Sequence, residues 1–98
     1  MTLQDIIADF QTLNEDLKIY EQKYGMPSAT FYKTFVQGEE PEDDSWVLDW
    51  ADWAGAYKIL LRRQEQYRAA IAILRLQKDS LGNVIQYTAR HEPISVAT

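Results

Sequence analysis

Residues 46–81 read WVLDWADWAGAYKILLRRQEQYRAAIAILRLQKDSL, and this stretch decides the fold. No Pro interrupts it, and Gly55 is its only strong helix breaker. Apolar and aromatic side chains recur every three to four residues, the spacing of one helical face. They form two heptad lines, Trp46, Trp53, Leu60, Tyr67, Leu74, Leu81 and Trp50, Tyr57, Gln64, Ile71, Lys78. The stretch therefore predicts one very long helix.

The length of this helix indicates that the chain does not act alone. A helix of about 36 residues extends roughly 54 Å, about twice the diameter of a compact domain of this size. Ile73 and Leu76 lie off both heptad lines, so the helix is apolar on several sides near its end. The alternative is a helix broken near Gly55 or Arg63, giving a compact four-helix monomer. We expect a helical dimer, with candidate interface residues Trp46, Trp50, Trp53, Tyr57, Leu60, Tyr67, Ile71 and Leu74.

A second heptad pattern precedes this stretch and predicts a long N-terminal helix over residues 3–24. Thr2 and Asp5 resemble a capping box at its start. Gly25 is placed for a left-handed residue just past its end, and Pro27 prevents its continuation. Its apolar seam consists of Leu3, Ile6, Phe10, Leu13, Leu17, Tyr20 and Tyr24.

The remaining segments are short. Ser28 is placed to cap a short helix over 29–37, which Gly38 ends. Gly82-Asn83 is a turn signal, and the β-type residues 84–88 after it favour an extended tail. We therefore expect an all-α protein: one helical domain over 1–82, built from a long, a short and a very long helix, and an extended C-terminal tail over 83–98.

Composition excludes several classes of function. The 98 residues carry ten Lys and Arg against fifteen Asp and Glu, a net charge of −5, which argues against nucleic-acid binding as the main role. The absence of Cys excludes thiolate chemistry, and a single His excludes most histidine metal sites. No apolar run reaches the length of a membrane span, and the N-terminus lacks a basic signal-peptide start. We expect a soluble cytoplasmic protein without a membrane partner.

The charge is unevenly distributed along the chain. Residues 1–45 hold three Lys against ten acids, whereas residues 46–81 hold six basic residues against four acids. Five acids gather between the short and the very long helix, and such asymmetry often marks a surface that faces a partner. The alternative is that Asp43, Asp44 or Ser45 caps the following helix. The candidate partner-binding residues are Glu39, Glu40, Glu42, Asp43 and Asp44.

Acid pairs raise the question of metal-dependent catalysis. Asp49 and Asp52 lie three residues apart, and Asp5 and Asp9 four apart, as in helical enzymes that hydrolyse nucleotides with magnesium. Both pairs fall on the polar faces opposite the seams, so solvated surface acids are the better interpretation. His91 stands alone and reads as a surface histidine. We expect no catalytic residue, no metal and no cofactor.

A helix-turn-helix unit around residues 17–37 is the alternative function. Gly25 lies at the turn and a Ser begins the next helix, as in units that read DNA. The would-be recognition helix carries Lys33 as its only cation, and five acids follow it. Its candidate DNA contacts are Ser28, Thr30 and Lys33.

Residues 20–57 contain a pattern of turns and aromatic side chains: Lys23-Tyr24-Gly25-Met26-Pro27-Ser28, Phe31-Tyr32, Phe35, Gly38-Glu39, Asp43-Asp44 and Trp50. This pattern resembles a group of small bacterial and cyanobacterial antitoxin-like proteins, often encoded beside a toxin. The shared pattern covers about forty residues, with Pro27 as a departure and the tail outside it. The resemblance implies a non-catalytic binding protein, the antitoxin of a type II toxin–antitoxin pair, which covers a basic surface on its toxin.

Overall fold

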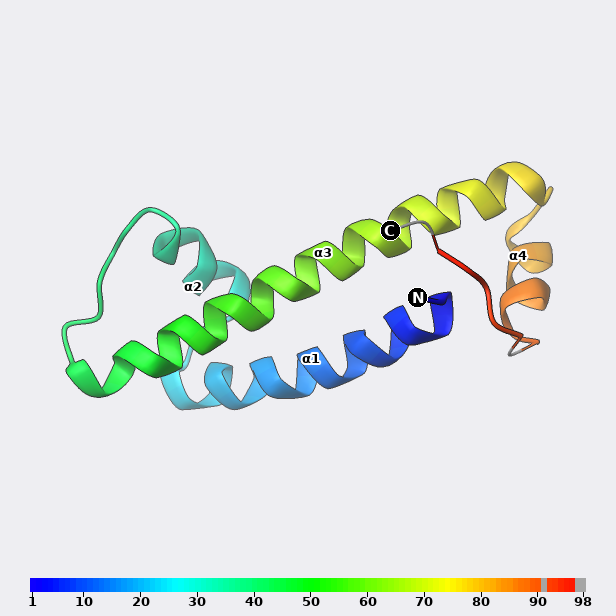
Figure 1. Cartoon of the computed structure of the whole chain (residues 1–98). Coiled ribbons are helices and arrows are strands. Elements are labelled where there is room, and N and C mark those ends of the chain that lie inside the picture. The colour runs from blue at the N-terminus through cyan, green and yellow to red at the C-terminus, as the bar shows by residue number, and fades with distance from the viewer. Residues whose placement is uncertain (91, 97–98) are drawn as a thin grey trace. The chain divides into compact units, whose positions relative to one another are not determined.

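The computed structural model describes residues 1–90 and 92–96, and this part of the chain confirms the predicted all-α class (Figure 1). It contains the helices α1 (Leu3–Tyr24), α2 (Ser28–Phe35), α3 (Val47–Gln77) and α4 (Leu81–Thr88) and a 3-10 turn, η1 (Asp44–Trp46). The chain divides into two compact units. Unit 1 comprises Met1–Phe10 and Arg62–Thr98, and unit 2 comprises Gln11–Leu61.

Helix α1 has the ends and the buried face that the sequence predicts. The Thr2 amide donates to the Asp5 carboxylate at 2.9 Å, and the Asp5 amide donates to the Thr2 hydroxyl at 3.2 Å. At the other end Gly25 has a φ of 69°, and its amide donates to the Glu21 carbonyl at 2.8 Å. All seven seam positions are buried or half-buried. The capping box, the left-handed Gly25 and the buried seam thus all match the helix predicted over residues 3–24.

Helix α3 runs from Val47 to Gln77 without a break at Gly55 or Arg63. A Cβ added at Gly55 would meet nothing within 4 Å, so no close backbone approach requires this glycine. The helix ends before the predicted Leu81, because Ser80 begins another helix. The Ser80 hydroxyl accepts a hydrogen bond from the Asn83 amide at 3.2 Å and caps α4.

Unit 2 is centred on an aromatic core between its helices. Phe31 of α2 and Trp53 of α3 are 5% and 1% exposed. Their rings stack, with centroids 3.8 Å apart and planes within 2°. Figure 1 shows α2 beside the first turns of α3, the arrangement that this stack requires.

Unit 1 corrects the predicted extended tail over 83–98. Residues 83–88 lie in α4, because the Ser80 cap and the burial of Val84, which is 4% exposed, outweigh local β propensity. Residues 92–96 are not helical and run beside the N-terminus, where Thr2 and Ser95 form an antiparallel bridge. The Leu3 amide donates to the Ile94 carbonyl at 2.7 Å. The expected surface histidine, His91, lies outside the described residues.

Candidate functional site

Ser28 connects three segments of unit 2. It is the first residue of α2 rather than the predicted cap, because the N-cap position belongs to Pro27. The Glu21 carboxylate accepts a hydrogen bond from the Ser28 amide at 2.8 Å and another from the Ser28 hydroxyl at 2.7 Å. The backbone N–H of the first residue of α2 is thus paired with a side chain of α1. The Trp53 indole N–H donates to the same hydroxyl at 2.8 Å. Each polar group at this buried junction is therefore partnered.

Around this junction the aromatic rings pack against one another and form a wall. Trp53 stacks on Tyr24 and Tyr20 as well as on Phe31, with centroid distances of 5.5 and 5.9 Å to the two tyrosines. Trp46 stacks on Trp50 at 6.0 Å and meets Tyr24 edge-on at the same distance. Such pairs add to the burial of their apolar area. The predicted stripe along α3 is thus tied to α1 and α2 within unit 2.

This wall forms one side of an open pocket of about 260 Å³. Trp53 and Phe31 close it inside, while Trp46, Trp50, Phe35 and Tyr24 are only half-buried. The Trp50 indole N–H is buried and has no acceptor among the described residues, an arrangement that costs about 1–3 kcal/mol. Glu39 is the only charged residue in the lining, which comprises Tyr24, Met26, Phe31, Thr34, Phe35, Glu39, Trp46, Trp50 and Trp53.

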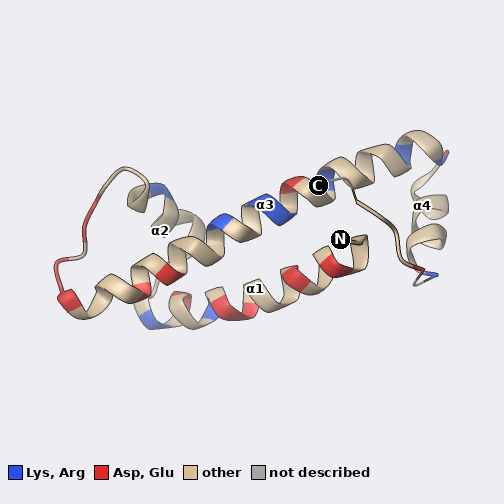
Figure 2. Ribbon diagram, in the orientation of Figure 1, with Lys and Arg blue, Asp and Glu red and all other residues tan. Residues whose placement is uncertain are grey.

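The acidic loop 39–44 begins at Glu39, which lines this pocket, and continues toward α3. Figure 2 shows acidic residues, in red, along the segment between α2 and α3. All five of its acids are exposed, and none forms an ion pair within residues 1–90 and 92–96. Asp43 also caps η1, since its carboxylate accepts from the Ser45 hydroxyl at 2.7 Å and from the Ser45 amide at 2.8 Å. These bonds, the hydroxyl bond first, lower the pKa of Asp43. The loop therefore presents unneutralised negative charge next to an aromatic pocket.

A second, polar hollow of about 440 Å³ lies elsewhere in unit 2. The Asp49 carboxylate there accepts from Lys23 Nζ at 2.5 Å and from the Tyr24 hydroxyl at 2.7 Å. These bonds, the lysine bond first, lower the pKa of Asp49, and the bond to Asp49 raises the pKa of Lys23. The hollow is lined by Asp16, Ile19, Tyr20, Lys23, Asp49, Asp52 and Ala56.

Three of the four acids considered for magnesium have other structural roles. Asp49 is paired with Lys23, Asp5 caps α1, and Asp9 accepts from Arg63 at 2.8 Å within unit 1. In the described part of the chain no group of three or more His, Asp and Glu side chains is arranged to hold a metal ion.

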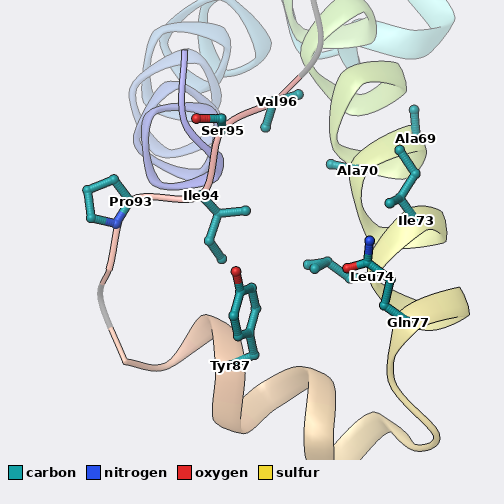
Figure 3. Close-up of a pocket in the computed structure, with 10 residues that line it drawn as sticks. All are labelled: Ala69, Ala70, Ile73, Leu74, Gln77, Tyr87, Pro93, Ile94, Ser95 and Val96. Atoms are coloured by element: carbon teal, nitrogen blue, oxygen red, sulfur yellow. The ribbon is translucent and has the colours of Figure 1, made fainter.

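Unit 1 contains a cavity of about 280 Å³ between α3, α4 and the tail (Figure 3). Figure 3 shows the Tyr87 side chain rising from α4, with its hydroxyl directed toward Ile94 of the tail. The α3 side of the cavity is lined by Ala69, Ala70, Ile73, Leu74 and Gln77. This cavity holds no charged residue in its lining.

The structure uses several of the predicted dimer residues inside the chain. Trp53, Leu60 and Leu74 are at most 6% exposed, and Tyr67 meets Phe10 edge-on at 5.7 Å. The three buried side chains leave no surface for a second copy. Tyr67 and the other predicted interface residues, Trp46, Trp50, Tyr57 and Ile71, are half-buried.

The three residues proposed for DNA contact differ in their exposure to solvent. Ser28 is 3% exposed and fully engaged with Glu21 and Trp53, whereas Thr30 and Lys33 are exposed. The sequence patterns did not indicate Glu21 as the partner of Ser28, or Met26 and Thr34 as part of the pocket lining. The seven-residue separation of Glu21 and Ser28 around a glycine stop is the one signal that could have indicated their bond.

Comparison with known proteins yields no match: no family model, curated sequence or solved structure is significantly similar to this chain. None of the helices in residues 1–90 and 92–96 is both long and apolar enough to cross a membrane.

Proposed function

We propose that this chain is a non-catalytic protein–protein interaction protein whose acidic loop covers a basic surface on a partner. The observation that carries the proposal is the position of the loop: it starts at a wall of the aromatic pocket and bears five exposed acids. Charge of one sign steers the encounter with a basic partner. Half-buried aromatic rings provide the anchors that slow its dissociation. The antitoxin role that the sequence resemblance implies is one case of this function.

Co-expression with each product of the adjacent genes tests the proposal. A partner should co-purify with the wild type and dissociate as salt is raised. The double variant Glu40→Gln/Glu42→Gln should weaken this complex several-fold. The matched control is Glu15→Gln/Asp16→Asn, which removes the same charge from an exposed face of α1. A complex whose affinity changes neither with salt nor in the loop variant would contradict the proposed surface.

The same proposal includes self-association through exposed apolar residues of unit 1. Leu76 and Ile73 of α3 are 89% and 52% exposed, and they lie three positions apart on one helical face. In α4, Leu81 and Ile85 are 61% and 52% exposed. Exposed apolar side chains in such number favour a protein contact. We therefore place the dimer surface on these residues.

A further inference from the structure

The lining of the unit 2 pocket combines aromatic rings with one carboxylate. Six of the nine lining residues are aromatic, and Glu39 is the only charged one. The lining contains no Lys, Arg or His that could attract an anion. Aromatic faces carry negative potential and attract cations that lie over them. The chemistry of the lining therefore suits a cation better than an anion or a neutral polar group.

The rings are held in place before any ligand arrives. Trp46 and Trp50 stack with planes 14° apart, and Tyr24 stands at 85° to Trp46. Tyr24 is fixed in turn by its hydrogen bond to Asp49, and Phe31 by its stack on Trp53. A site with fixed walls loses little conformational entropy on binding.

The surroundings of the pocket indicate where the cation comes from. Beyond Glu39 the chain continues into Glu40, Glu42, Asp43 and Asp44, all exposed and none in an ion pair among the described residues. A small free cation needs no such extended acidic rim, whereas a basic protein segment presents several charges together. The guanidinium group of arginine is planar and stacks on aromatic faces while it binds a carboxylate.

We infer that this pocket receives an arginine side chain of a basic partner protein, with the guanidinium over the Trp46 and Trp50 rings and paired with Glu39. The inference rests on the proposed function, since the arginine belongs to the partner that the acidic loop covers. It assigns the pocket a specificity for positive charge rather than for apolar volume.

Titration of the isolated protein with capped single residues tests this directly. The probes are N-acetyl-arginine methylamide, its citrulline analogue, which has a similar shape without the charge, and its norleucine analogue, which is apolar. The readout is the shift of the three tryptophan indole N–H signals in nuclear magnetic resonance spectra. The arginine probe should bind about tenfold more tightly than either analogue. Equal binding of norleucine or citrulline, or no shift with arginine, would overturn the inference.

Matched variants locate the effect. Glu39→Gln should weaken arginine binding several-fold, whereas Glu40→Gln, an exposed acid outside the lining, should change it less than about twofold. Trp46→Phe should retain most of the binding, and Trp46→Leu should lose it, because only the first keeps an aromatic face. Unchanged binding in Trp46→Leu would contradict a cation site.

The probe experiment tests the arginine pocket, and the co-expression experiment tests the proposed function, so a negative result in one does not decide the other. A partner that co-purifies while arginine binds no better than citrulline would reject the arginine pocket and keep the proposed function. Selective arginine binding without any partner would support the pocket and count against the proposed function.

Discussion

The indole N–H of Trp53 donates a hydrogen bond to the hydroxyl of Ser28 at 2.8 Å, between residues that are 1% and 3% exposed. The two residues are 25 positions apart and lie on different helices. The same hydroxyl donates to the Glu21 carboxylate at 2.7 Å. One small polar side chain thereby joins α1, α2 and α3 within unit 2. It also allows Trp53 to be fully buried without an unpaired donor.

Ser28→Ala should destabilise the protein because it leaves the Trp53 donor buried and unpaired. We expect the free energy of unfolding to fall by about 1–3 kcal/mol, measured by urea denaturation. The control is Thr30→Ala, an exposed position on the same helix, which should change stability by less than about 0.5 kcal/mol. Equal stability of the wild type and Ser28→Ala would show that the bond contributes little.

Two glycines should respond in opposite directions to alanine. Gly25 has a φ of 69°, so Gly25→Ala forces a side chain into a left-handed conformation and should destabilise by about 1 kcal/mol. Gly55 lies inside α3 with nothing within 4 Å of an added Cβ, so Gly55→Ala should stabilise by about 0.5–1 kcal/mol. Thermal unfolding compares both with the wild type. Destabilisation by Gly55→Ala would indicate a contact at this position that the single chain does not contain.

The pairing of Asp49 with Lys23 and Tyr24 should appear in the pH dependence of stability. Because the bonds from Lys23 and Tyr24 hold the pKa of Asp49 below its usual 3.8, the unfolded state takes up a proton first as pH falls. The contribution of Asp49 to the free energy of unfolding therefore decreases from about pH 5 downward. It is lost as the pH falls through the lowered pKa.

Asp49→Asn should be less stable than the wild type at neutral pH and should lose less stability on acidification. Urea denaturation at several pH values measures both effects. Asp52→Asn is the control, since this neighbouring acid forms no ion pair within the described residues. If the free energy of unfolding falls equally steeply with acidification in the wild type and in Asp49→Asn, the result would contradict a lowered pKa of Asp49.

The helices could be predicted from sequence where local signals and tertiary packing agree. Both ends of α1 follow from Thr2, Asp5 and Gly25, whose hydrogen bonds are local. The prediction was wrong for 83–88, where Ser80 caps a helix that the β-type residues after it disfavour. Val84 is 4% exposed, and its burial together with the cap outweighs the β propensity of this segment. The propensities of residues 84–88 alone do not reveal that burial.

The candidate site could be predicted only in its composition. The aromatic stripe of α3 was recognisable from its spacing, and the acidic loop from its charge. Their connection through Glu39 depends on α2, which places Phe31 and Phe35 beside Trp50 and Trp53. The helical spacing of Trp46, Trp50 and Trp53 is the same for a dimer seam and for the wall of a pocket. Only the packing partners distinguish the two.

The exposed apolar residues of α3 lead to the last prediction, which concerns self-association. Leu76 is 89% exposed, and its burial against a second copy would remove a large apolar area from water. We expect light scattering to give about twice the 11.4 kDa mass of one chain, and Leu76→Glu to shift it toward one chain. Leu48→Glu is the matched control, because Leu48 is 77% exposed on the same helix but belongs to unit 2. A wild-type mass of one chain at every concentration, or equal dissociation by both variants, would contradict a dimer through Leu76.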